Sequence, residues 1–151
     1  MAKIKIQVND SVNIRGNNSI RIGDGRQVFE TNFNIPQRDL STGYQLQHSY
    51  LTYMIKGLTV ATTNPDIRIN NQIVGQIQRA HGADPNHWFT QTVTIARGNT
   101  YPIPLRQGTN ELEIRAVTYP SANAGDLFDD FFLRNIILTY TYFINVDTGL
   151  F

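Results

Sequence analysis

Residues 27–35 read Gln-Val-Phe-Glu-Thr-Asn-Phe-Asn-Ile, and this pattern is the clearest indication of the fold. Large apolar residues recur at every second or fourth position, so Phe29, Phe33 and Ile35 share one face of an extended chain. The turn Gly23-Asp24-Gly25 precedes the stretch and is typical of a β-hairpin. The pattern therefore predicts a strand that buries one face.

The same alternation recurs along the whole chain, separated by turn residues, and no segment keeps a helical period for more than two turns. At 151 residues the chain is long enough for one domain with its own core. We expect an all-β protein, a single antiparallel β-sandwich of about nine or ten strands in jelly-roll or Greek-key order. The candidate strands are residues 1–10, 12–15, 19–22, 27–35, 46–60, 67–69, 73–74, 88–95, 100–105, 110–118 and 131–146.

The composition excludes several classes of function. The chain has no cysteine, which rules out a disulfide framework, a thiolate metal site and a cysteine nucleophile. Its formal charge of +1 has no basic run behind it, so we expect no nucleic-acid binding. No stretch approaches the 18 or so apolar residues that span a membrane, so no membrane span is expected.

The two ends of the chain indicate where the protein works. Residues 1–10 alternate, with Ile4, Ile6 and Val8 on one face, and contain no apolar core of a signal peptide. We expect a cytoplasmic product, or one that is released or assembled on a virion or cell surface by a non-classical route. The apolar end Gly149-Leu150-Phe151 favours a protein that lives in an assembly.

A C-terminal segment resembles a known family. Gln107-Gly108-Thr109-Asn110-Glu111-Leu112-Glu113-Ile114, followed by the run Asp129-Asp130-Phe131-Phe132-Leu133-Arg134-Asn135-Ile136-Ile137-Leu138-Thr139-Tyr140, is similar to the last two strands of galactose-binding-like jelly rolls. That family contains many non-catalytic carbohydrate-binding modules, and others that bind proteins or act as scaffolds. The resemblance implies a recognition module.

The resemblance also implies a structural calcium near a sheet edge. The positions that match this site are Asp129 or Asp130, with Asp126 and Asn123 nearby. Their side chains offer the oxygen ligands that Ca²⁺ prefers, of which it takes six to eight. The alternative, which we favour, is that Asp129 and Asp130 hydrogen-bond backbone N–H groups ahead of the last strand. We expect no other cofactor.

Residues for catalysis are scarce, so we expect no enzyme. The five serines lie in no nucleophile-elbow motif, and His48 falls within a strand. His81 and His87 flank a loop at a spacing that only weakly indicates zinc. By strand geometry the carboxylates of Glu111 and Glu113 lie roughly 7 Å apart on one strand face, but they share that face with Arg115, and a solvated sheet surface of mixed charge is the ordinary explanation.

A sugar site on a β-sandwich needs an exposed aromatic ring and fixed polar groups. The candidate aromatics are Trp88, Tyr101 and Tyr119, although a single tryptophan in a sandwich is more often buried between the sheets. The candidate polar partners are Arg115, Asp84 and Asn86.

Two hypotheses follow from these observations. The first is a non-catalytic recognition module that binds a glycan or a protein surface through loops at one end of the sandwich. The second is a structural subunit of a homomeric assembly, such as a phage tail or virion, a contractile injection machine or an extracellular filament. Ten arginines against three lysines support self-association, because arginine is enriched at protein interfaces.

Overall fold

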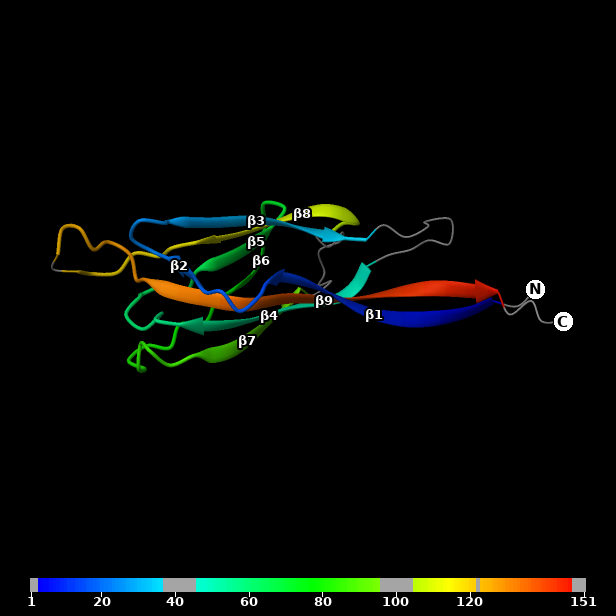
Figure 1. The fold of residues 1–151 in the computed structure, drawn as a ribbon, viewed down its shortest axis with the longest axis horizontal. Helices are drawn as coiled ribbons and strands as arrows, with labels where there is room; N and C mark the ends of the chain where they lie inside the picture. The colour runs from blue at the N-terminus through cyan, green and yellow to red at the C-terminus, as the bar shows by residue number, and fades with distance from the viewer. Residues whose placement is uncertain (1–2, 37–45, 96–104, 122, 148–151) are drawn as a thin grey trace.

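The computed structural model describes residues 3–36, 46–95, 105–121 and 123–147, and these form nine strands without a helix. The strands make two antiparallel sheets (Figure 1), which confirms the predicted all-β sandwich. No helix long and apolar enough to cross a membrane occurs in these ranges. The strands are β1 (Lys3–Arg15), β2 (Ile20–Ile22), β3 (Val28–Ile35), β4 (Leu46–Lys56), β5 (Asp66–Ile69), β6 (Gln72–Gln76), β7 (Phe89–Ile95), β8 (Gly108–Arg115) and β9 (Phe131–Asp147).

The order of the strands is that of a jelly roll. One sheet runs β1-β9-β4-β7, with the short β2 also paired to β9, and the other runs β3-β8-β5-β6. The chain crosses from one sheet to the other at almost every connection, and only β5 and β6 are a hairpin within one sheet. Such crossings pair strands that are distant in sequence, as the two interlocked Greek keys of a jelly roll do.

The core lies between the two sheets. Strand β4 is central in its sheet, as predicted, with β9 on one side and β7 on the other, and it buries Leu51, Tyr53 and Ile55. Strand β3 buries Phe33 and Ile35 from the opposite sheet, which confirms the alternation. The two apolar faces therefore cover each other.

The predicted tight hairpin between residues 69 and 72 is present. Asn70 and Asn71 both have positive φ, at 50° and 66°. This is the backbone of a two-residue type I′ turn, in which asparagine is favoured because it tolerates the left-handed region.

Strand β9 contains the bulge that its sequence predicts. Asn135 has φ 52°, and its N–H donates to the carbonyl of Gly16 at 2.8 Å. The pairing with β4 shifts between Arg134 and Ile137, where β9 has one residue more than β4. Before the bulge Leu133 points inward, and after it Ile136 does. The extra residue thus reverses the alternation, which is why this run is apolar on both faces.

Strand β1 differs from expectation in two ways. The predicted strands at 1–10 and 12–15 form one continuous strand paired with β9. The first part of its apolar face is not covered, because Ile4 and Ile6 are 52% and 41% exposed, whereas Val8 further along the strand packs against the core. Figure 1 shows the reason: β1 and β9 run on together beyond the other described strands.

Two further details depart from the sequence pattern. Glu113 points to the outer face of its sheet, as expected, but is only 5% exposed, because it lies between β3 and β5 with Arg115 beside it. Most of the predicted strand at 100–105 lies outside the described residues, and Leu105 is buried but belongs to no strand.

Candidate functional site

One end of the sandwich gathers most of the predicted site residues. The connections at residues 23–27, 57–65, 77–88 and the described parts of 116–130 all lie beside the first residues of β9 (Figure 1). We call this the loop end. The opposite end, where β1 and β9 extend as a two-stranded ribbon, is the ribbon end.

Asp129 is a buried carboxylate at the loop end that accepts backbone hydrogen bonds. The residue is 4% exposed, and its Oδ2 accepts the N–H groups of Val60 at 3.0 Å and Ala61 at 2.8 Å. Burial raises the pKa of Asp129, because desolvation disfavours the charged carboxylate, and the amide hydrogen bonds only partly oppose the rise. Asp129 therefore does what the capping alternative predicts of it, and turns away from the other carboxylates.

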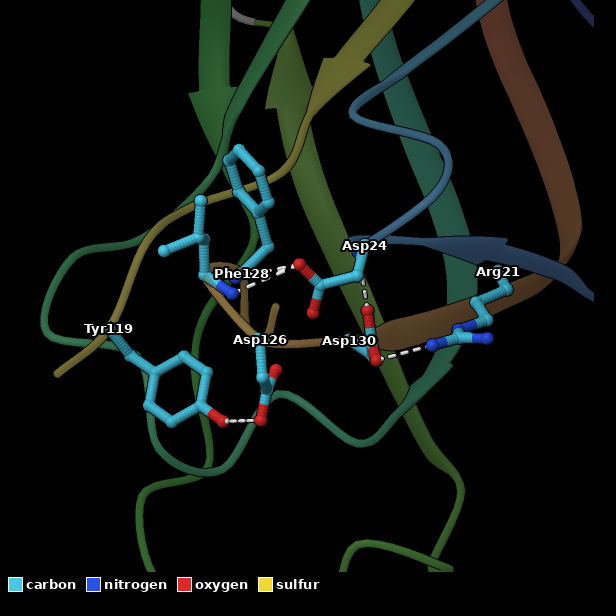
Figure 2. Close-up of polar contacts among 7 residues, drawn as sticks. Arg21, Asp24, Tyr119, Asp126, Phe128 and Asp130 are labelled. Carbon is cyan, nitrogen blue, oxygen red and sulfur yellow. Dashed lines mark hydrogen bonds and ion pairs between the residues drawn. The ribbon is translucent and has the colours of Figure 1, made fainter. Parts of the chain in front are cut away.

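The neighbouring Asp130 joins three segments at the surface. Its Oδ1 accepts the backbone N–H of Asp24 at 2.7 Å, and its Oδ2 accepts the Arg21 guanidinium at 2.6 Å. Asp24 Oδ1 in turn accepts the N–H groups of Leu127 and Phe128 (Figure 2). The turn before β3 and the loop before β9 are thus tied together.

Tyr119 holds the loop before β9 from its other side. Its hydroxyl donates to Asp126 Oδ2 (Figure 2), and this hydrogen bond raises the pKa of Tyr119. The predicted aromatic is therefore partly buried and engaged within its own loop rather than presented as a bare ring.

The predicted metal residues divide between these two places. Asp126 and Asp130 lie with Asp24, each able to bring one carboxylate oxygen within 4.8 Å of the others, while Asp129 points elsewhere. Four of the six oxygens of this trio already accept hydrogen bonds from Arg21, Tyr119 or backbone amides. Carboxylates have the right chemistry for Ca²⁺, but an ion here would compete with these hydrogen bonds and would need carbonyls or water to complete its shell of six to eight oxygens. The calcium site stays a prediction.

Trp88 lies on the outer face of the five-stranded sheet, and not between the sheets. Its ring is partly exposed, with the Arg134 guanidinium 4.1 Å and the Lys56 ammonium 5.0 Å from the ring centroid. The Lys56 ammonium also lies 5.2 Å from the centroid of Phe132. We call these four residues the Trp88 cluster. Cation–π contacts of this kind contribute about 0.5–2 kcal/mol each and fix the orientation of the ring.

The cations of the Trp88 cluster are electrostatically unbalanced. No described carboxylate forms an ion pair with Arg134 or Lys56, and the Nε of Arg134 is buried without a hydrogen-bond partner. A buried N–H donor without an acceptor costs free energy, so the position of Arg134 is set by its contact with the Trp88 ring and not by hydrogen bonds of Nε.

The remaining predicted ligand residues are not gathered into one site. Asp84 and Asn86 are exposed in the same loop as Trp88, where Asp84 Oδ1 accepts the N–H of Asn86 at 2.9 Å. Arg115 lies on the outer face of the other sheet and donates to Glu113. Tyr101 lies outside the described residues.

The residues considered for chemistry do not assemble into a catalytic cleft within the described ranges. His81 and His87 are both exposed, and His87 packs edge-on against Phe89 at 4.8 Å. Glu111 and Glu113 lie with Glu30 on the outer face of β3 and β8, where their carboxylates approach within 4.8 Å. This acidic cluster stands on the outer surface of the four-stranded sheet.

Sequence reasoning missed Arg134, Lys56 and Phe132 as partners of Trp88. Cross-strand pairing brings Lys56 opposite Phe132 and Met54 opposite Arg134 on the outer face. Phe132 and Arg134 are two positions apart ahead of the bulge, which indicates that they share the outer face of β9. Only the pairing of β9 with β4 brings them next to Lys56, and the sequence pattern does not show that pairing.

Comparisons with known proteins add no family. No family model matches this chain, and no curated protein matches it either. The two sheets of the structure establish the β-sandwich. The galactose-binding-like assignment stays a prediction that rests on the C-terminal segment.

Proposed function

We propose that this protein is a non-catalytic recognition module that binds a glycan at the loop end, with the Trp88 cluster as its contact surface. The observation that carries the proposal is an indole ring held at the surface by two cations that form no ion pair with any described carboxylate. A sugar ring presents an apolar C–H face for the indole and hydroxyls for Lys56 and Arg134 to bind.

The surroundings of the ring support this proposal. Phe132 supplies a second aromatic surface beside Lys56. The exposed Asp84 and Asn86 lie in the loop that leads into Trp88 and offer further polar groups. Because hydrogen-bond donors surround the ring, the Trp88 cluster suits a polar ligand better than it suits a protein partner, whose interface centre is usually apolar.

A glycan array followed by calorimetric titration of the best oligosaccharide tests the proposal. We expect saturable binding that Trp88→Ala abolishes and that Trp88→Phe retains in part, because the phenyl ring keeps some stacking area. Ile73→Ala is the matched control, since Ile73 is 56% exposed on the other sheet. Failure of every glycan to bind the folded wild-type protein would contradict the proposal.

A second candidate function, self-association in a homomeric assembly, has its own observation. At the ribbon end, Ile4 stands opposite Val146 and Ile6 opposite Ile144, and these partners share one face. Ile4, Ile6 and Val146 are exposed large apolar residues. Within the described chain β1 pairs only with β9, so its outer edge also offers backbone groups to another strand.

A second copy of the same chain suits this surface, because an uncharged apolar patch matches itself in a two-fold interface. Light scattering across a range of concentrations tests this. We expect wild type to associate and the double variant Ile4→Thr, Ile6→Thr to remain a monomer, while Ile73→Thr behaves as wild type. A wild-type protein that stays monomeric at high concentration contradicts self-association.

A further inference from the structure

A second charged feature lies at the edge of the five-stranded sheet, apart from the Trp88 cluster. The end of β1, strand β2 and the turn into β3 enclose a surface hollow of about 430 Å³. Three arginines line it, Arg15, Arg21 and Arg26, together with Ser19 and the single carboxylate of Asp24. We call it the arginine hollow.

Two of the three positive charges have no described carboxylate to balance them. Arg15 is held by backbone oxygens, with Nε donating to the carbonyl of Asn18 at 2.6 Å, and a carbonyl does not neutralise its charge. The side chain of Arg26 is exposed and makes no hydrogen bond or ion pair with any described residue. Only Arg21 is paired, with Asp130.

The carboxylate in the hollow is already engaged. Oδ1 of Asp24 accepts the N–H groups of Leu127 and Phe128, and that hydrogen bonding draws the side chain toward the loop before β9. Asp24, Asp126 and Asp130 gather on the side of Arg21 that faces this loop. Arg15 and Arg26 are left as planar guanidinium groups without a described ion-pair partner, and their forked donors match the oxygens of phosphate and sulfate.

We propose that the arginine hollow binds a tetrahedral oxyanion, the sulfate or phosphate ester group of a ligand. Arg15 is pre-positioned by its carbonyl contacts, and Arg26 is free to close on the anion. The volume lies within the range of small-molecule sites and exceeds the needs of one oxyanion, so part of the esterified molecule fits beside it. This site is independent of the proposed contact surface at Trp88.

An NMR titration that follows the Nε–H signals of the arginines tests the proposal directly. The first probes are sodium sulfate and sodium phosphate, with sodium chloride holding the ionic strength constant. We expect saturable shifts of the Arg15, Arg21 and Arg26 signals with a Kd on the order of millimolar. Glucose 6-sulfate and glucose 6-phosphate follow, and the ester that binds more tightly identifies the source of the anion.

Single-charge variants separate a built site from general attraction. Arg26→Gln removes a side chain without a described partner, so the fold stays intact, and we expect binding to weaken roughly tenfold. Lys5→Gln removes one charge at the ribbon end and leaves binding unchanged. Shifts that do not saturate, or equal weakening by the two variants, would overturn the proposal.

Discussion

The loop end and the ribbon end of this sandwich differ in how far their side chains and backbone groups find partners within the chain. At the loop end a buried carboxylate, Asp129, satisfies the amides of a neighbouring loop, and Asp130 ties two further segments together. At the ribbon end Ile4 and Ile6 stay in water and one strand edge has no described neighbour. The loop end is therefore held in shape by hydrogen bonds among its own segments, whereas the ribbon end leaves apolar side chains in water.

Substituting one isoleucine at each end should give the largest contrast. Ile22 is fully buried in β2 at the loop end, so Ile22→Ala should lower the free energy of unfolding by about 2–5 kcal/mol. Ile4→Ala at the ribbon end should cost less than about 0.5 kcal/mol in dilute protein, because Ile4 is already exposed. Urea denaturation measures both. Equal losses would show that the ribbon face is covered in the monomer.

Removing the buried carboxylate should give the next largest effect. Asp129→Ala leaves the N–H groups of Val60 and Ala61 without their acceptor, which should cost roughly 2–4 kcal/mol. Asp129→Asn is the matched control, since one amide oxygen can accept both bonds. Guanidinium denaturation at neutral pH measures the difference, and an Asp129→Ala variant as stable as Asp129→Asn would remove the capping role.

A glycine beside the same loops should give a smaller effect. Gly57 has φ 94°, and a Cβ there would lie 2.8 Å from the backbone oxygen of Asp130. Gly57→Ala should therefore cost about 1–3 kcal/mol. Gly125→Ala, where a Cβ meets nothing within 4 Å and φ is not strained, should have almost no effect on the thermal midpoint. Indistinguishable midpoints would mean that the loop before β9 yields easily.

The pH dependence should give the smallest effect. Because burial raises the pKa of Asp129 above its ordinary 3.8, the folded protein keeps this proton at pH values where the unfolded chain has lost it. Its contribution to stability is therefore complete below pH 3.8 and is lost as pH rises through the raised pKa. The stability of Asp129→Asn relative to wild type should increase over that window. Parallel curves from denaturation at a series of acidic pH values would contradict the raised pKa.

The sandwich was predictable from sequence because its signals are local. Alternation in β3, the Asn70-Asn71 turn and the doubly apolar run of β9 each report a short-range property of the backbone. The exposure of Ile4 was not predictable, because alternation shows which residues share a face but not whether another strand covers it.

The candidate site was predictable only in part, for a related reason. Trp88 was singled out by its residue type and the aspartates before β9 by the family resemblance, but the neighbours of both come from distant positions. Asp24 meets Asp130 across 106 residues, and Arg134 reaches Trp88 only through the pairing of β9 with β4. Residue type indicates which side chains can bind a ligand, whereas the long-range strand pairing of the sandwich decides which of these side chains lie next to one another.

The division of work between the two ends is tested most directly by one backbone-amide NMR titration, with the best glycan from the array added to dilute wild-type protein. We expect saturable shifts at Lys56, Trp88 and Arg134, with Ile4 and Val146 unmoved. Shifts centred on the ribbon end, with no change in the Trp88 cluster, would contradict glycan binding at the loop end.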